Sequence, residues 1–190
     1  MVQERWFFRD NDEWEAFAER LKLMPCPHCK CVGALIKHGC LGGLADGRRT
    51  VRARRVFCSN RQARPGCGRT VSVWCADTIR RLSVTTHTLW RFLQQLVAGS
   101  IAAAIRSVAA DCRRSVRTWQ RLWKRFNLAQ STIRTALCGR CPPPELPAAV
   151  PVVPARRAAA AQVLAHLQAA FQGAANPIAA FQHAFRTFFV

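Results

Sequence analysis

Apolar residues alternate with polar ones in the first part of the chain and recur every three or four residues in the second. Alternation is clearest in residues 50–57, where arginines lie between small or apolar side chains. This pattern is typical of a half-buried strand. We therefore expect three antiparallel strands, at residues 32–38, 50–57 and 70–74, with the glycine-rich residues 39–47 forming the bend between the first two.

After residue 84 the apolar spacing becomes helical. A first apolar stripe ends at Gly99, and Ser100 and Ser115 are suited to cap a second and a third helix. The third helix carries basic residues opposite its apolar face, so the three helices are expected to form a helix-turn-helix unit. The connection at residues 109–114 is longer than the turn that is usual for this motif.

Both ends of the chain also predict helices. Residues 12–22 favour a short amphipathic helix with Asp12 as its cap, which either covers one side of the sheet or docks a partner. Residues 142–154 hold six of the ten prolines and predict a stiff, extended linker. Beyond it, residues 155–190 predict two amphipathic helices, the second starting at Asn176, which either pack on the body or mediate self-association or binding of a partner protein.

Four cysteines are spaced to hold one zinc ion. Two residues separate Cys26 from Cys29, and eight separate Cys58 from Cys67, which has a glycine on each side to permit a tight turn. Zinc prefers four soft ligands in a tetrahedron, and thiolates in two turns beside a small sheet are typical of a zinc ribbon. The alternative is four buried thiols without a metal.

The remaining cysteines are not expected to belong to this site. Cys138 and Cys141 form a second CxxC pair, which predicts a helix-ending turn unless Cys112 or a partner chain completes a second zinc site. The side chains that lie near the first site in the sequence, but at unsuitable spacing, are Cys31, Cys40, Cys75 and His28.

A net charge of +19 arises from 29 lysines and arginines against 10 acidic residues. The excess is uneven, because residues 1–24 are acidic on balance whereas residues 25–145 hold 22 bases and four acids. A basic, arginine-rich segment attracts a polyanion and suits phosphate and guanine contacts, although a merely solvated surface is the alternative. The DNA contacts expected on the second strand and the third helix are Arg52, Arg54, Arg55, Arg113, Arg114, Arg117, Gln120, Arg121 and Lys124.

Several other classes of protein are not favoured. The charged N-terminus carries no apolar leader segment and no run of roughly eighteen apolar residues occurs, so we expect a cytoplasmic, nucleoid-associated protein with reduced cysteines. Neither a phosphate-binding glycine loop nor an HExxH or Gly-x-Ser-x-Gly motif occurs. A site of four thiolates also leaves zinc no open position for chemistry, so no enzyme activity is expected.

Together these elements predict an α+β protein without a membrane-spanning segment. An N-terminal amphipathic helix (1–24) is followed by a small zinc ribbon with a three-stranded antiparallel sheet (25–80) and by a helix-turn-helix domain (85–141). The proline-rich linker (142–154) and an α-helical tail (155–190) complete the chain.

Four short motifs carry a resemblance to a known family. They are Cys26-Pro27-His28-Cys29, Phe57-Cys58, Gly66-Cys67-Gly68-Arg69-Thr70 and Arg117-Thr118-Trp119. In this order, over residues 25–135, they resemble the N-terminal DNA-binding region of bacterial insertion-sequence transposases. The resemblance implies a zinc ribbon ligated by the four cysteines and a third helix that reads the terminal repeats of a mobile element. In that family a separate downstream domain cuts DNA with three carboxylates that hold two metal ions.

The chain departs from the family pattern in two places. Its second cysteine pair is separated by eight residues where two is usual, and Asp77, Asp111 and Glu145 are too scattered to form a carboxylate triad. We therefore expect an accessory or regulatory DNA-binding protein without a nuclease domain. The alternatives are a stand-alone transcription regulator and an RNA-binding zinc ribbon, which would need exposed aromatic side chains such as Trp74 for base stacking.

Overall fold

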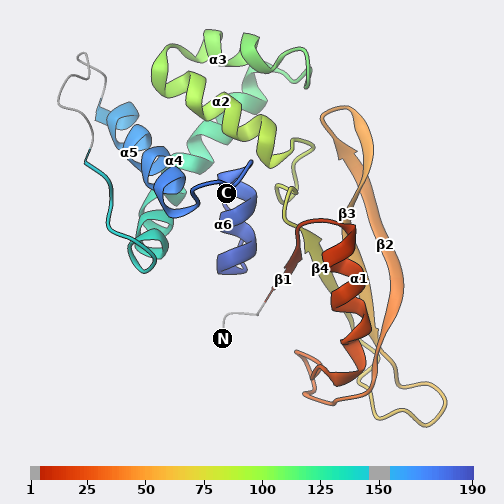
Figure 1. The fold of residues 1–190 in the computed structure, drawn as a ribbon. Coiled ribbons are helices and arrows are strands. Elements are labelled where there is room, and N and C mark those ends of the chain that lie inside the picture. Colours follow the sequence, from red (N-terminus) through yellow and green to blue (C-terminus); the bar gives the residue numbers. More distant parts are fainter. Residues whose placement is uncertain (1–4, 146–154) are drawn as a thin grey trace.

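A four-stranded sheet and six α-helices make up the computed structural model, which describes residues 5–145 and 155–190 (Figure 1). The protein is therefore of the α+β class. The strands are β1 (Trp6–Phe8), β2 (Leu35–Ala45), β3 (Arg48–Cys58) and β4 (Thr70–Cys75). The helices are α1 (Asn11–Glu19), α2 (Thr86–Ala98), α3 (Ile101–Val108), α4 (Val116–Cys138), α5 (Ala155–Ala170) and α6 (Pro177–Phe185), with a 3-10 turn (Leu21–Leu23) after α1.

The sheet is mixed, with the strand order β1-β4-β3-β2. Strands β2, β3 and β4 are antiparallel as expected, but β1 pairs in parallel with β4 and places Trp6 opposite Val73. The expectation of a purely antiparallel sheet of three strands was therefore wrong. Trp6, Phe7 and Phe8 are all buried, so β1 lacks the alternation of polar and apolar residues that reveals a strand in a sequence.

The hairpin between β2 and β3 turns at Asp46 and Gly47 only. Both residues have positive φ angles, 49° and 81°, as a two-residue hairpin turn of the Asp-Gly type requires. The expected bend over residues 39–47 was therefore wrong, because β2 continues through these glycines. Its register against β3 shifts after Lys37 and again after Leu41, so irregular pairing accommodates the glycine-rich sequence.

Helix α1 covers one face of the sheet (Figure 1). Asp10 is its N-cap, rather than Asp12 as expected, and accepts a hydrogen bond from the Glu13 N–H at 2.8 Å. Trp14 is buried on the sheet side of the helix, in an apolar cluster that includes Val56 of β3. The amphipathic N-terminal segment therefore has a structural role, which was one of its two interpretations.

Two helices of the helical part begin where their capping residues predict. Ser100 Oγ accepts from the Ala103 N–H at 3.2 Å and Ser115 Oγ from the Thr118 N–H at 3.4 Å, so both serines are N-caps. These caps confirm the predicted starts of α3 and α4. Helix α4 is anchored by Trp119, whose ring stacks on Phe92 of α2 with a centroid separation of 4.6 Å.

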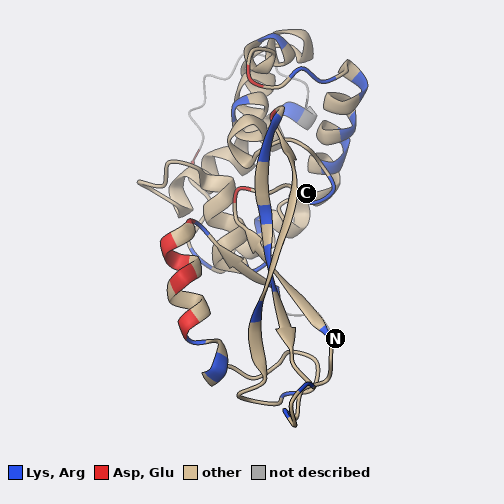
Figure 2. Cartoon of the chain, turned by 90° about the vertical axis from the view of Figure 1, so that its right-hand side faces the viewer, with Lys and Arg blue, Asp and Glu red and all other residues tan. Residues whose placement is uncertain are grey.

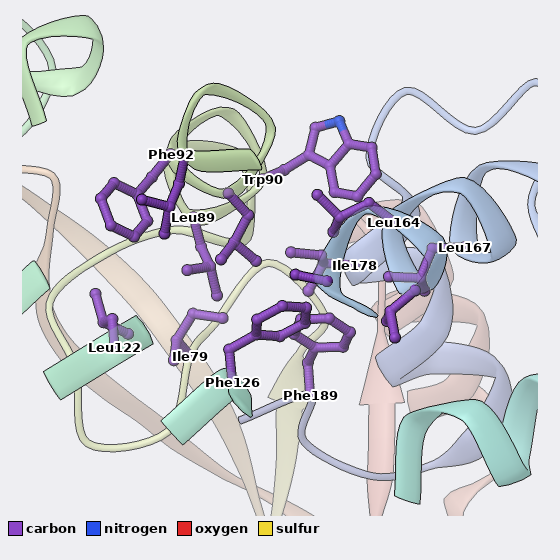
Figure 3. Packing of buried hydrophobic residues seen from close by; sticks show 14 of the residues in the cluster. Ile79, Leu89, Trp90, Phe92, Leu122, Phe126, Leu164, Leu167, Ile178 and Phe189 are labelled. Atoms are coloured by element: carbon purple, nitrogen blue, oxygen red, sulfur yellow. The ribbon is translucent and has the colours of Figure 1, made fainter. Parts of the chain in front are cut away.

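The two tail helices complete the core of the helical part. Figure 3 shows Leu164 and Leu167 of α5 and Ile178 of α6 among the side chains of α2 and α4. After α6, Phe189 stacks on Phe126 of α4 at 5.7 Å. The tail therefore packs on the body, and an additional role in self-association stays a prediction. Most of the expected linker, residues 146–154, lies outside the described residues.

Side-chain hydrogen bonds join the sheet to the helices at the hairpin tip. The Asp46 carboxylate accepts from the Thr85 N–H at 3.2 Å, from the Thr85 hydroxyl at 2.6 Å and from the Thr88 hydroxyl at 2.8 Å, at the start of α2. On α6, the buried Gln182 donates to the Ala76 carbonyl at 2.6 Å, just beyond β4. The sheet and the helices are therefore fixed to each other at the end of the sheet farthest from the cysteines.

Candidate metal centre and nucleic-acid interface

The four cysteines expected as ligands meet at one end of the sheet. Cys26 and Cys29 follow the 3-10 turn (Leu21–Leu23), Cys58 ends β3, and Cys67 precedes β4. Cys26 Sγ lies 3.9 Å from Cys67 Sγ, and Cys29 Sγ lies 3.7 Å from Cys58 Sγ. All four sulfur atoms lie within 4.8 Å of one another.

These distances fit a metal ion held by four thiolates. In a tetrahedral zinc site the metal lies about 2.3 Å from each sulfur, which places the sulfur atoms about 3.8 Å apart. A disulfide would need a sulfur separation of about 2.05 Å. All ten cysteines of the described residues are free. The cluster can therefore bind a metal ion, and its geometry suits zinc.

Backbone amides shape both cysteine turns around the sulfur atoms. The His28 N–H donates to Cys26 Sγ at 3.4 Å and the Cys67 N–H to Cys58 Sγ at 3.3 Å. Hydrogen bonds of this kind stabilise thiolates in metal sites. Gly66 is required in the second turn, because a Cβ on it would lie 2.2 Å from the Ser59 carbonyl oxygen.

The eight-residue spacing of the second pair is also explained by this turn. The Gly66 N–H donates to the Ser59 carbonyl at 3.1 Å, which brings the two ends of residues 59–66 together. The intervening residues therefore form a side loop, and Cys67 returns beside Cys58. The departure from the usual spacing leaves the four-sulfur geometry intact.

The thiols differ in how readily they ionise without a metal. The Cys31 N–H hydrogen bond lowers the pKa of Cys29 to about 7, whereas burial raises the pKa of Cys58 to about 12. Burial also raises the pKa of Cys67. A metal ion must displace the protons of these buried thiols, so binding is coupled to proton release.

The other cysteines lie outside this cluster. Within the part of the chain that the structure describes, the four named cysteines are the only group of three or more potential metal ligands. Cys138 is the last residue of α4, and the Cys141 N–H donates to the Leu137 carbonyl at 3.0 Å. The second CxxC pair therefore forms a helix-ending turn, as one interpretation of the sequence expected.

Most of the expected DNA contacts on α4 lie at the surface. Trp119, Leu122 and Phe126 face the core, whereas the exposed side of the helix carries basic and polar residues together with the exposed Val116 and Leu128. Arg114 is the exception, because it is half-buried and donates to the Ser83 carbonyl at 3.5 Å. The exposed side chains are Arg113, Arg117, Gln120, Arg121 and Lys124.

The strand arginines are less available than the sequence suggested. Arg52 is half-buried, donates to the Ile79 carbonyl at 2.5 Å, and has a pKa lowered by burial. Arg54 donates to Asn11 Oδ1 at 3.0 Å and lies 5.8 Å from the Trp14 ring, under α1. We therefore remove both from the expected DNA contacts. Arg55 points to the other face of the sheet and forms no hydrogen bond or ion pair with the described residues.

The structure adds basic residues that the sequence analysis did not single out. Arg80 and Arg81 follow β4 and lie close to Arg125 of α4, whose pKa is lowered by burial and by these two like charges. Arg5 and Arg80 both lie over the Phe188 ring, at 5.5 and 5.8 Å. The adjacent arginines at 80 and 81 were a visible signal, but nothing in the sequence links them to Arg125 or Phe188.

Acidic and basic residues occupy opposite sides of the molecule. Figure 2 shows the positions of the acidic residues of α1 along one edge, and those of Lys and Arg along the hairpin and the helices on the other side. In Figure 1, α1 lies in front of the sheet whereas α4 runs behind α2 and α5.

No protein-family model, curated protein or solved structure matches this chain. The resemblance to insertion-sequence transposases therefore stays a prediction from the four motifs. None of the helices in the described residues is both long enough and apolar enough to cross a membrane.

Proposed function

We propose that this protein binds duplex DNA through α4. We further propose that a zinc ion holds the cysteine end of the sheet, and that the protein is an accessory or regulatory factor in transposition. The exposed basic side of α4 is the observation that carries this proposal. It stands on a helix whose other side is locked in the core, so its side chains keep a fixed spacing. The partner of such a surface is a polyanion.

The spacing along α4 suits a major groove. Arg117 and Arg121 are four residues apart, which is about one turn and about 6 Å along the helix axis. Both are exposed, and each guanidinium can form two hydrogen bonds to a guanine edge. Lys124, one turn beyond Gln120, can contact a phosphate.

The long connection between α3 and α4 is braced at its start by α2. Arg91 of α2 donates to the Ser107 carbonyl at 2.7 Å and forms an ion pair with Asp111 at the start of the connection. Ser115 then caps α4 at its end. Both ends of the connection are therefore tied to neighbouring helices, which fixes the direction in which α4 leaves it.

The metal is proposed to be zinc with a structural role. Four thiolates in a tetrahedron suit zinc or iron, and zinc undergoes no redox change. With four protein ligands the ion would have no open coordination position, so it would stabilise the fold rather than catalyse a reaction. Metal analysis of the purified protein distinguishes zinc from iron, and a folded chain without either would refute this part.

Selection of bound fragments from a random duplex pool tests the DNA-binding proposal. A sharp sequence motif is expected, and Arg117→Ala or Arg121→Ala should each cost about 1–3 kcal/mol on the selected site with little loss on scrambled DNA. Arg134→Ala is the matched control, because Arg134 is also exposed on α4 but lies in its C-terminal half. Equal losses for Arg117→Ala and Arg134→Ala on both duplexes would refute α4 as the reading helix.

The role in transposition is supported by the resemblance alone. A stand-alone transcription regulator would use the same contacts on α4. The selected sequence separates the two, because it should occur at the ends of a mobile element in the first case and upstream of genes in the second.

A further inference from the structure

The face of the sheet turned away from α1 is only partly covered. On the α1 side, Val56, Val71 and Val73 are buried. Side chains alternate between faces along a strand, and the partners of β3 and β4 share a face, so Phe57 and Trp74 point to the opposite side. The residues of this open face that keep part of their surface accessible are Arg55, Phe57, Thr70, Ser72 and Trp74.

A cavity of about 230 Å³ lies on this open face along β4, from Thr70 to Trp74. Trp74 and Phe188 both line it and pack edge to face on each other, with their ring centroids 5.2 Å apart. The guanidinium groups of Arg5 and Arg80 lie at its rim, and Ser72 adds a hydroxyl. Neither arginine forms an ion pair with a carboxylate of the described residues. The cavity therefore combines stacking surfaces with two cations that have no anionic partner.

The cavity continues into a basic ridge that reaches α4. Arg80 and Arg81 lie near Arg125, and none of the three forms an ion pair with a carboxylate of the described residues. The acids of the described residues lie elsewhere, on or beside α1, at the start of α2, next to Arg91, or at position 145. Three neighbouring arginines repel one another, so a ligand that carries negative charge would stabilise this arrangement.

A second aromatic position lies on the neighbouring strand β3, opposite Thr70 of the cavity. Phe57 packs beside His38 with ring centroids 5.2 Å apart, and the Arg61 guanidinium lies 5.7 Å from its ring. Phe57 lies four positions along β3 from Ala53, the partner of Trp74, which corresponds to about 13 Å along the sheet. The face therefore offers two aromatic rings, each accompanied by arginine, along one line.

We propose that this open face binds an unpaired nucleic-acid strand, with one base stacked in the Trp74 cavity, another on Phe57, and phosphates on Arg5 and Arg80. Aromatic rings spaced along a basic groove are the usual means of binding single strands, because every base has a face that can stack. The inference rests on nucleic acid being the partner of this protein. It differs from the α4 proposal in the surface used and in the form of the ligand.

Fluorescence anisotropy with the full chain tests this inference. The probes are a short labelled thymidine oligonucleotide, its RNA equivalent, an abasic oligonucleotide of the same length, and the duplex selected for α4. Trp74→Leu should weaken binding of the thymidine strand on the order of tenfold, since stacking on one aromatic ring contributes about that much. Abasic and duplex affinities should stay unchanged. Arg80→Gln should weaken the thymidine and abasic strands alike, and Arg134→Gln should weaken neither.

The outcomes separate this inference from the proposed function. If the protein binds the duplex, and Trp74→Leu does not weaken binding of the thymidine strand, the open face is not a stacking site. If Trp74→Leu weakens binding of the thymidine and abasic strands equally, the face does not recognise bases. Binding of poly-glutamate as tight as that of the thymidine strand would also refute base recognition. Absence of binding to every nucleic acid refutes the proposed function itself. Trp74→Phe keeps a ring at this position and should restore most of the affinity, which separates loss of stacking from loss of folding.

Discussion

The two ends of the sheet are held by different means. At the cysteine end, a small apolar cluster under α1 surrounds Cys26 and Cys58, and four sulfur atoms converge there. At the hairpin end, the sheet is tied to a much larger core to which five helices contribute, including the buried Trp119 and Phe126. One end thus brings four potential metal ligands together, and the other is held by apolar packing and carboxylate caps.

This difference indicates which part of the chain can fold by itself. A small domain buries too little apolar surface to offset its conformational entropy and commonly needs a metal or disulfides. The sheet with α1 fits this description, whereas the helical part buries aromatic and aliphatic side chains from α2 through the tail. We therefore expect the stability of the sheet, but not that of the helices, to depend on metal.

The largest effect is expected from loss of a metal ligand. A structural zinc ion contributes on the order of 10–16 kcal/mol in small domains, which matches or exceeds the stability of a typical domain. Cys29→Ser should therefore unfold residues 25–75 while α2 to α6 stay helical. Hydrogen exchange of the sheet amides, together with the zinc content of the purified variant, measures this directly.

Cys40→Ser is the matched control for that experiment. Cys40 is an exposed thiol on β2 outside the four-sulfur cluster, so its replacement should leave both the zinc content and the exchange rates unchanged. If Cys29→Ser behaves like Cys40→Ser, the metal is not what holds the cysteine end. If the helices unfold together with the sheet, the two ends are not independent.

Local signals in the sequence were sufficient for the four clustered cysteines and for the starts of α3 and α4. A cysteine turn and a capping serine each act over a few residues, so Cys26, Cys29, Ser100 and Ser115 could be interpreted without knowledge of the rest of the fold. The zinc ion itself and the binding of DNA stay predictions.

Features that depend on distant contacts could not be predicted in this way. Strand β1 has three residues that are buried on both sides, and its parallel partner lies some 67 residues away along the chain, from Trp6 to Val73. Likewise, Arg54 resembles an exposed strand arginine until α1 is placed over it. Tertiary packing decided both outcomes, and the alternation pattern carries no information about it.

A smaller effect is expected from Asp46, which ties the hairpin end of the sheet to α2. Asp46→Ala removes the acceptor for the Thr85 N–H and for the hydroxyls of Thr85 and Thr88. Leaving donors of this kind without an acceptor lowers the free energy of unfolding by about 1–3 kcal/mol. For a protein of this size, 1 kcal/mol lowers the melting temperature by about 2–4 °C. Faster exchange at the hairpin tip, with unchanged zinc content, is the expected result.

Asp46→Asn serves as the control for the turn itself. Asparagine also tolerates the positive φ of this hairpin position and keeps one acceptor oxygen, so it should retain part of the lost stability. Should Asp46→Ala leave the exchange of the hairpin tip unaltered, the carboxylate would not be what ties the sheet to α2.

The smallest effect concerns Asp77, a second carboxylate at the start of α2. It accepts hydrogen bonds from the Thr86 N–H at 3.2 Å and from the Thr86 hydroxyl at 2.5 Å. Burial raises the pKa of Asp77, whereas the hydrogen bonds donated by Thr86 and His87 lower it. Burial is the larger effect, so the pKa lies above its ordinary value of 3.8. The folded protein therefore holds this proton more tightly than the unfolded chain does.

A raised pKa in the folded state fixes the sign of the pH dependence. Between the ordinary pKa of about 3.8 and the raised folded value, the folded protein binds more protons than the unfolded chain, so Asp77 lowers stability as the pH rises through this range. Asp77→Asn cannot ionise and should gain stability relative to the parent protein over the same range, by on the order of 1 kcal/mol or less. Urea unfolding at a series of pH values measures the difference, with the exposed Asp12→Asn as the matched control. If the difference between Asp77→Asn and the parent stays constant with pH, or shifts in favour of the parent as the pH rises, then burial does not outweigh the hydrogen bonds at this cap.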